Sequence, residues 1–309
     1  MKEADRRPGG AVDRLDGTAV VINHDDGPRL GPLLDLLTDE VERIVVVDNA
    51  SSDGSERQAQ DRPRVTLLRN DRNLGFAAAV NQGAGLAQGS WLVLVNPDAH
   101  LQPGDIARLV DGLPGDVAAA APLQVDEHRV AKPESGGYDP TVLRYLLWAV
   151  LPVRFHGRFG PWLAKPSGEG DVAMDWVSGA LLAIRRDAFE RVGRLDDRFF
   201  LYHEDVELGR RLRRAGYRVV LRQSQLLYHE VADGEHDRRI RQALLGLDSV
   251  AIDFEGWRRP FLGAALTLGF SLRAVAASGT SRTLARAALP SCLRMIVGRR
   301  PGAGGAGTG

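Results

Sequence analysis

The chain has 309 residues, of which 44% are apolar, so it can bury a sizeable core and is not intrinsically disordered. Lys and Arg total 40, as do Asp and Glu, so the overall charge gives no reason to expect a nucleic acid partner. The single cysteine, Cys292, excludes an internal disulfide and a cysteine-rich zinc site, which fits a reducing cytoplasmic setting. Residues 1–17 lack the apolar segment of a secretory signal and are expected to form a disordered leader.

Short β-branched runs alternate with segments of helical spacing through the first hundred residues. Strands are expected in residues 18–23, 43–48, 64–70 and 91–96, and helices in residues 28–41 and 75–89. Strands that are apolar throughout and separated by helices indicate a parallel sheet covered on both faces. Residues 18–100 are therefore predicted to be the nucleotide-binding half of an α/β domain, with ligands outside the carboxyl ends of the strands.

The second half of this domain, residues 101–255, is less regular. The pattern predicts a strand in residues 117–126, a strand leading into a helix in residues 174–193, and a helix ending near Gly216 with a strand after it. Further on, helical spacing with scattered arginines predicts a basic amphipathic helical extension over residues 256–298. Glycine-rich residues 299–309 are expected to be a flexible tail.

Polar side chains stand where predicted strands end, at Asn23, Asp48 and Asp98. Ordinary turns and helix caps would account for such residues. As ligands, Asp48 could accept a hydrogen bond from the imide N–H of a pyrimidine, and Asp98 could bind Mg²⁺ or Mn²⁺ beside a diphosphate. The chain has no P-loop pattern and no strand followed by G-x-G-x-x-G, which disfavours kinase-like and dinucleotide-binding functions.

A second acidic group, Glu204 and Asp205, begins a predicted helix. Neighbours in a helix point about 100° apart, so only one of the two can face a reacting atom. The pair could be a solvated first turn that complements the helix dipole. Alternatively, since two aromatic residues and a histidine precede it, one carboxylate could be a general base in a walled pocket while the other orients neighbours. His229 is either structural or a metal ligand that joins Asp98.

Six motifs stand in a fixed order: VVINHDDG, VVVDNASSDGS, NLGFAAAVNQG, LVLVNPDAH, the segment 176–219, and LLYHE. Together they resemble family 2 glycosyltransferases of the inverting GT-A type, and among these the bacterial rhamnosyltransferase-like branch, over residues 18–232. The resemblance implies an α/β fold with a Rossmann-like, mostly parallel central sheet flanked by helices. It also implies one glycosyltransferase domain, residues 18–255, followed by the helical extension.

The resemblance assigns the donor site to the ends of the first strands. Asp48 would contact the nucleobase, Asn73 would line the donor site beside Asn23, and Asp98 would be the metal-binding carboxylate. Many members have Asp-x-Asp where this chain has Asn96-Pro97-Asp98. Asn96 contributes no charge but can still bond a ribose hydroxyl, and the variant is familiar in the rhamnosyltransferase-like branch.

The resemblance also assigns the reaction and its other residues. Asp205 would deprotonate the acceptor hydroxyl with Glu204 beside it, His229 would be a further metal ligand, and Trp176 and Gly179 would shape the acceptor and sugar pocket. The implied reaction is metal-dependent transfer of L-rhamnose from dTDP-rhamnose to a cell-envelope glycan or a polyprenyl-diphosphate-linked acceptor. Alternatives are a UDP-sugar donor, such as galactofuranose or a hexose, and a non-catalytic nucleotide-sugar-binding scaffold.

The basic tail raises the question of a membrane. Its longest uncharged apolar run, residues 261–272, has 12 residues, well below the roughly 18 to 20 that span a bilayer. After Glu255 the chain has eight arginines and no acidic residue, so the tail could lie on the anionic inner leaflet, pack on the domain, or form a dimer contact. Residues 145–159 could form an apolar lip for a lipid-linked acceptor or belong to the core. The expected location is cytoplasmic, with peripheral attachment to the inner face of the plasma membrane as one possibility.

Overall fold

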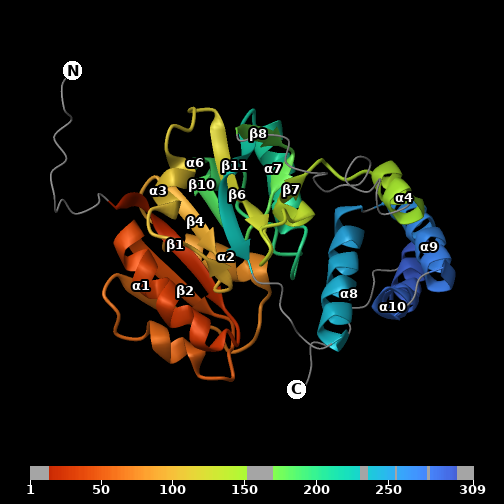
Figure 1. The fold of residues 1–309 in the computed structure, drawn as a ribbon, viewed down its shortest axis with the longest axis horizontal. Helices are drawn as coiled ribbons and strands as arrows, with labels where there is room; N and C mark the ends of the chain where they lie inside the picture. The colour runs from red at the N-terminus through yellow and green to blue at the C-terminus, as the bar shows by residue number, and fades with distance from the viewer. Residues whose placement is uncertain (1–13, 152–169, 230–235, 255, 277–278, 298–309) are drawn as a thin grey trace.

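The computed structural model describes residues 14–151, 170–229, 236–254, 256–276 and 279–297. Within these residues, nine strands form one sheet in the order β3-β2-β1-β4-β10-β6-β11-β5, with β8 also paired to β11 (Figure 1). The strands are β1 (Leu15–Asn23), β2 (Val41–Asp48), β3 (Val65–Arg69), β4 (Trp91–Val95), β5 (Ala99–His100), β6 (Val117–Val125), β8 (Asp171–Met174), β10 (Leu181–Arg185) and β11 (Arg218–His229). A second, small sheet pairs β7 (Gly136–Gly137) with β9 (Trp176–Val177).

The N-terminal half of the sheet is parallel, as predicted. β1 pairs in parallel with both β2 and β4, and β2 pairs in parallel with β3. The register places Asn23 opposite Asp48, so the ends of these strands lie side by side. Farther along, β10 runs antiparallel to its neighbours β4 and β6, whereas β6 and β11 are parallel. The sheet is therefore mixed, with its parallel part under the predicted donor site.

Helices cover both faces of the sheet, which explains why the strands are apolar without alternation. On one face lie α1 (Leu30–Glu40) and α3 (Asp105–Val110), and on the other lie α2 (Phe76–Ala84), α6 (Arg186–Arg191) and α7 (Glu204–Arg214). Gly83 lets α2 approach β1 closely, because a Cβ there would lie 2.5 Å from Val20 Cγ1. Apolar residues three and four positions apart on α1, among them Leu30, Leu34 and Leu37, are buried against the sheet.

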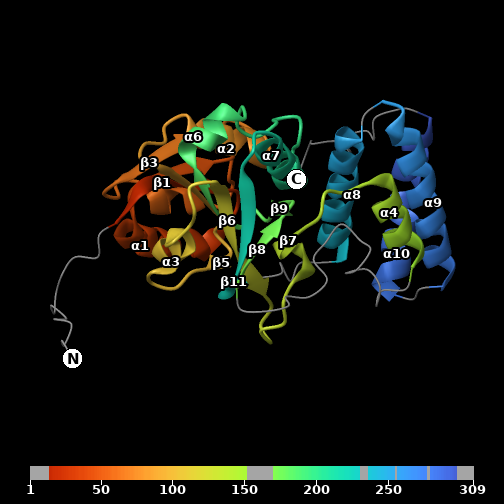
Figure 2. The ribbon, with the colours of Figure 1, turned by 90° about the horizontal axis from the view of Figure 1, so that it is seen from above.

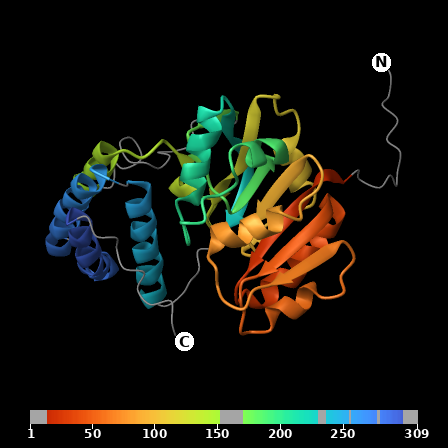
Figure 3. The ribbon, with the colours of Figure 1, turned by 180° about the vertical axis from the view of Figure 1, so that it is seen from behind.

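Four further helices form a group beside the sheet domain: α4 (Val142–Val150), α8 (His236–Asp253), α9 (Arg258–Ala276) and α10 (Gly279–Ile296). They share an apolar cluster of their own, which includes Phe254, Leu266 and the fully buried Cys292. Figures 2 and 3 place α8 between the sheet domain and the other three helices. None of the helices in the described part of the chain is long and apolar enough to span a membrane.

The elements differ from the predicted ones mainly at their ends. β1 begins at Leu15, three residues before the predicted strand. The strand and helix predicted in residues 174–193 are β10 and α6, with the short β9 before them. Residues 1–13, 152–169 and 299–309 lie outside the described residues, and these include most of the predicted leader, the second half of the predicted apolar lip and the predicted tail.

Candidate active site

A buried polar cluster joins the ends of β1 and β2. Asn23 is fully buried, and its Nδ2 donates to Asp48 Oδ1 at 2.7 Å and to Ser51 and Ser55 Oγ at 2.9 Å. Ser51 Oγ also donates to Asp48 Oδ1 at 2.6 Å. The predicted donor residue Asn23 thus lies beneath Asp48, where it fixes the orientation of that carboxylate.

Asn49, one residue after Asp48, organises the neighbouring loop. Its Oδ1 accepts from Asn70 Nδ2 at 3.1 Å and from the Leu74 N–H at 3.0 Å, while its Nδ2 donates to Asn73 Oδ1 at 2.8 Å. Asn73 Oδ1 also accepts from the Gly75 N–H at 2.9 Å. Asn73 was predicted from the sequence and Asn49 was not, although Asn49 is a polar residue directly after a strand end, like Asp48 and Asp98.

Asp98 and His229 meet across the sheet. Asp98 Oδ1 lies 3.0 Å from His229 Nε2, because β5 follows the Asp98 turn and pairs antiparallel with the end of β11. Gln124 Oε1 lies 3.0 Å from the other ring nitrogen, Nδ1. Burial favours the neutral acid, but the hydrogen bond and charge of His229 outweigh it and hold the pKa of Asp98 below its usual value.

This arrangement suits a divalent cation. The contact between Nε2 and Asp98 is a hydrogen bond that needs a proton on Nε2, and a bound cation would take the place of that proton while Nδ1 donates to Gln124, so that Nε2 and Asp98 Oδ1 both face the cation. The described residues contain no cluster of three or more His, Cys, Asp or Glu side chains arranged for a metal. A cation here would thus share its shell with substrate phosphates and water, as Mg²⁺ and Mn²⁺ do. Asn96 has a side-chain amide in place of a carboxylate, and its backbone N–H donates to Ala180 O at 2.9 Å.

Two more charged residues, Asp26 and Lys132, lie around Asp98 and were missed by the sequence analysis. Burial, with the charge of Asp98 adding to it, raises the pKa of Asp26 to about 6. Lys132 Nζ donates to the backbone oxygen of His229, and burial lowers the pKa of this lysine. Asp26 belongs to the VVINHDDG motif but was not singled out there, and Lys132 belongs to none of the six motifs, so only the folded chain reveals that both lie near Asp98.

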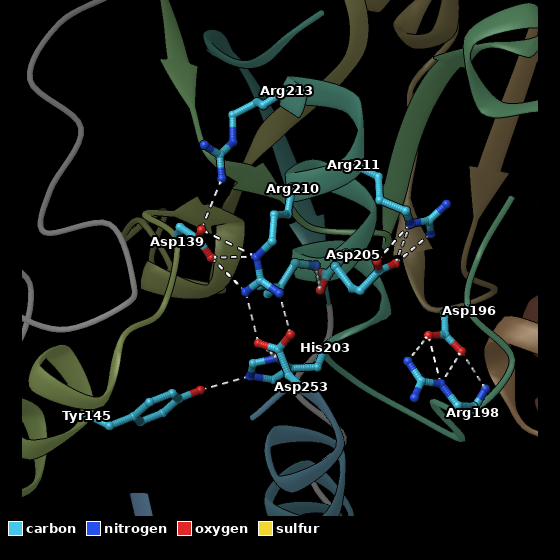
Figure 4. A network of polar contacts seen from close by, with 12 residues as sticks. Asp139, Tyr145, Asp196, Arg198, His203, Asp205, Arg210, Arg211, Arg213 and Asp253 are labelled. Carbon is cyan, nitrogen blue, oxygen red and sulfur yellow. Dashed lines mark hydrogen bonds and ion pairs between the residues drawn. The ribbon is translucent and has the colours of Figure 1, made fainter. Parts of the chain in front are cut away.

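Glu204 and Asp205 begin α7, and Figure 4 shows Asp205 among the polar contacts of this helix. Glu204 is 6% exposed, and its Oε2 makes no hydrogen bond. Burial, reinforced by the charge of Asp205, raises the pKa of Glu204 to about 8. Burial also raises the pKa of Asp205 to about 6, and hydrogen bonds from the backbone N–H groups of Val206 and Gly179 limit the rise. Burial thus raises the pKa of both carboxyls, and that of Glu204 more, which favours a proton on Glu204 over one on Asp205.

The two residues predicted to shape the acceptor and sugar pocket lie near this helix in different ways. Gly179 is half-buried and contacts Asp205 through its backbone N–H. Trp176 is 5% exposed, and its Nε1 donates to Tyr138 O at 3.2 Å. Gly209 of α7 packs directly on Trp176, since a Cβ at position 209 would lie 3.0 Å from Trp176 Cα. Trp176 thus packs against α7 at Gly209.

Comparisons with known proteins identify the family of this chain. Residues 18–160 match the family model described as Glycosyl transferase family 2, and residues 143–298 match Glycosyl transferase family group 2. A Mycobacterium tuberculosis protein, N-acetylglucosaminyl-diphospho-decaprenol L-rhamnosyltransferase, is 34% identical over 236 residues, 68% of this chain and 75% of that protein. The chain is a family 2 glycosyltransferase.

One further relative and two solved structures are also similar to this chain. Rhamnosyltransferase WbbL of Escherichia coli is 23% identical over 230 residues, which cover 71% of this chain and 84% of WbbL. A mannosyltransferase from Pyrobaculum calidifontis, solved with GDP-Man and Mn²⁺, has a TM-score of 0.53 at 19% identity, and the match covers 91% of this chain and 85% of the mannosyltransferase. GalNAc-T7, solved with UDP, GalNAc and Mn²⁺, has a TM-score of 0.57 at 16% identity, and the match covers 92% of this chain and 57% of GalNAc-T7. These two structures establish the GT-A fold of this glycosyltransferase.

Proposed function

We propose that this glycosyltransferase moves L-rhamnose from dTDP-rhamnose to a polyprenyl-diphosphate-linked precursor of a cell-envelope glycan, with inversion at the anomeric carbon. The observation that carries the proposal is the 34% identity to a rhamnosyltransferase whose name specifies a decaprenol-linked acceptor. Asp205, which accepts from the backbone N–H of Gly179, and the pair of Asp98 and His229 supply the base and the metal-binding groups that such a transfer needs.

The mechanism is a single displacement. Asp205 accepts the proton of the acceptor hydroxyl while that oxygen forms a bond to the anomeric carbon, and the bond from this carbon to the diphosphate oxygen breaks. A base with a pKa of about 6 is ionised at neutral pH yet basic enough to take the proton. Asp48 holds the nucleobase, oriented by Asn23, and Asn73 lines the donor site. Inversion follows because the acceptor approaches from the face opposite the leaving group.

The divalent cation of this proposal, Mg²⁺ or Mn²⁺, would be held by Asp98 and His229. When bound, it supplies positive charge that offsets the charge on the departing diphosphate. The fit rests on the convergence of Asp98 Oδ1 and His229 Nε2, which lie 3.0 Å apart. The imidazole ligand favours Mn²⁺, whereas oxygen ligands suit either ion.

A panel of nucleotide sugars tests the reaction and separates it from the alternatives. We expect transfer from dTDP-rhamnose to a polyprenyl-diphosphate acceptor, and Asp205→Asn should abolish it while leaving dTDP binding intact in calorimetry. The matched control is Asp197→Asn, which changes an exposed carboxylate on the same segment. If the protein turns over UDP-galactofuranose or a UDP-hexose but not dTDP-rhamnose, the donor is a UDP-sugar. If it binds a nucleotide sugar but neither transfers nor hydrolyses any of them, it is a non-catalytic nucleotide-sugar-binding scaffold.

We further propose that α9 rests on the anionic inner leaflet. Five exposed apolar residues lie within an arc of about 60° along this helix and the turn before it, at 100° per residue. They are Trp257 (76% exposed), Phe261 (61%), Leu268 (50%), Leu272 (50%) and Val275 (81%), and we call them the α9 stripe. The rings of Trp257 and Phe261 pack edge to face, 6.0 Å apart, at one end of the stripe.

The charge of the tail indicates which surface the α9 stripe binds. The chain after Glu255 has eight arginines and no acidic residue, so an anionic lipid surface complements it, whereas two copies that met stripe to stripe would bring like charges together. In a flotation assay, the protein should float with phosphatidylglycerol vesicles more than with phosphatidylcholine vesicles. Phe261→Ser with Leu268→Ser should prevent this, while Leu86→Ser, an exposed leucine outside the helical group, should not. Equal flotation of all variants, or a dimer that these serines disrupt, would contradict the proposal.

A further inference from the structure

The turn before the proposed base has an unusual backbone. Tyr202 and His203 are consecutive non-glycine residues in the left-handed region, with φ values of 68° and 70°. Side chains disfavour this conformation, so it persists only where surrounding contacts hold it, and such sites are frequent at active centres. Because His203 directly precedes Glu204 and Asp205, whatever holds this turn also sets the position of the carboxylate of Asp205.

Contacts from α8 and α4 hold the turn. Ser249 of α8 donates from Oγ to Leu201 O at 2.7 Å, and Gly246 lies against the ring of Tyr202, since a Cβ there would be 3.7 Å from Tyr202 Cδ2. From α4, Tyr145 OH lies 2.8 Å from His203 Nε2. Burial lowers the pKa of His203 to about 4, so the ring is neutral and bonds Tyr145 without a charge.

A buried ion-pair network fixes the rest of α7 to the same helices. Arg210, five residues after the proposed base, bonds Asp253 through Nη1 at 2.5 Å and Nη2 at 3.0 Å, and bonds Asp139 through Nη2 at 2.7 Å (Figure 4). The side chain of Asp253 is only 2% exposed, and its Oδ2 lies 3.7 Å from His203 Nδ1. One carboxylate from α8 thus faces both the turn before the base and the second turn after it.

Asp253 occupies a position that helix stability alone would not favour. It is the last residue of α8, where the helix dipole repels a negative charge. The two-pronged contact with Arg210 compensates, since a guanidinium fork holds both oxygens of a carboxylate in a fixed orientation. The carboxylate at this helix end is therefore held by its contact with α7.

We propose that Asp253 and Tyr145 are positioning residues for the glycosyl transfer, which hold the strained turn and α7 so that Asp205 faces the acceptor hydroxyl. This inference rests on the proposed function, in which Asp205 is the base. Misplacing a reacting group by about 1 Å can lower a rate by about a hundredfold, so the contacts of α8 affect turnover through the position of α7. On this proposal, α4 and α8 contribute to the catalytic centre by holding its base in place.

The test separates kcat from KM in the full-length protein. Asp253→Asn keeps the shape but loses the charge, and should lower kcat between about tenfold and a hundredfold with an unchanged KM for the nucleotide sugar, because Asp48 and Asn73 lie elsewhere. Tyr145→Phe, which keeps the ring packed in the apolar cluster, should lower kcat less. Asp248→Asn, a carboxylate on the same helix outside the network, should leave kcat unchanged.

The readouts distinguish positioning from simple support of the fold. Folded fractions are matched by measuring each variant well below its unfolding temperature. If Asp253→Asn lowers only the unfolding temperature while kcat per folded molecule stays at the wild-type level, the positioning role is refuted. If Asp205→Asn keeps wild-type turnover, the proposed function fails instead. An inactive Asp205→Asn beside a fully active Asp253→Asn would overturn this inference alone.

Discussion

Replacing Glu204 by glutamine should make the protein more stable in alkaline solution. Burial raises the pKa of this carboxyl from 4.5 to about 8, so the folded state holds its proton more tightly than the unfolded chain. A group with a raised folded pKa contributes its full stability below pH 4.5 and loses it as the pH rises through 8. At 1.36 kcal/mol for each pKa unit, this loss is up to about 5 kcal/mol in the free energy of unfolding.

Glutamine resembles the protonated acid in shape and cannot ionise, so Glu204→Gln should lack this loss. Urea unfolding of both proteins between about pH 5 and pH 9, followed by tryptophan fluorescence, gives the difference in unfolding free energy at each pH. We expect that difference to grow with pH in favour of the variant. Glu42→Gln, at an exposed glutamate, is the matched control and should show a constant difference.

The charge of Asp205 is the second cause of the raised pKa, which provides an internal check. In an Asp205→Asn background the gain from Glu204→Gln should shrink, because the neighbouring charge is gone. Two unfolding curves for wild type and Glu204→Gln that run parallel from acid to alkaline pH would refute the reasoning. The pair would then share its proton differently, and the assignment of the ionised form to Asp205 would fall with it.

Three further predictions concern other parts of the protein. The kcat of the wild type should fall about tenfold for each pH unit below about 6, because the base must be ionised, and a flat acidic limb would contradict this assignment. Asn49→Ala should weaken dTDP binding in calorimetry by loosening the loop of Asn73, whereas an unchanged affinity would leave Asn49 a purely structural residue. Gly209→Ala should destabilise the fold by about 1 to 3 kcal/mol, because its Cβ would lie 2.5 Å from Asp175 O. Gly170→Ala, where nothing lies within 4 Å, should have no such effect on the unfolding temperature.

Local patterns in the sequence predicted most of the fold. Apolar strands separated by helical spacing predicted the parallel part of the sheet, and this prediction is confirmed by the pairing of β1 with β2 and β4. The antiparallel insertion of β10 was not predicted, because strand direction depends on how a long connection returns to the sheet. The roles of Asp48, Asp98 and Asp205 remain predictions.

Contacts between distant residues were beyond the sequence. Asp98 and His229 are 131 residues apart and meet only because β5 pairs with β11. Arg210 and Asp253 are 43 residues apart, and no periodicity indicates that the end of α8 would lie on α7. Lys132 was missed for the same reason, since its neighbour His229 comes from another strand. Burial and charge pairing of this kind become visible only after the strands are ordered.

The hydrogen bond from the Asn96 N–H to Ala180 O joins the loop of Asp98 to the loop of Gly179 at a distance of 2.9 Å. It continues the antiparallel ladder in which Val95 faces Leu181. In the proposed mechanism, the leaving-group side and the base side are therefore joined through one shared ladder, which fixes the distance between the two loops. In a chimera of two such enzymes, residues 91–98 and 179–185 should therefore come from the same parent. Segments that are exchanged to change the sugar or acceptor preference should lie outside these two ranges.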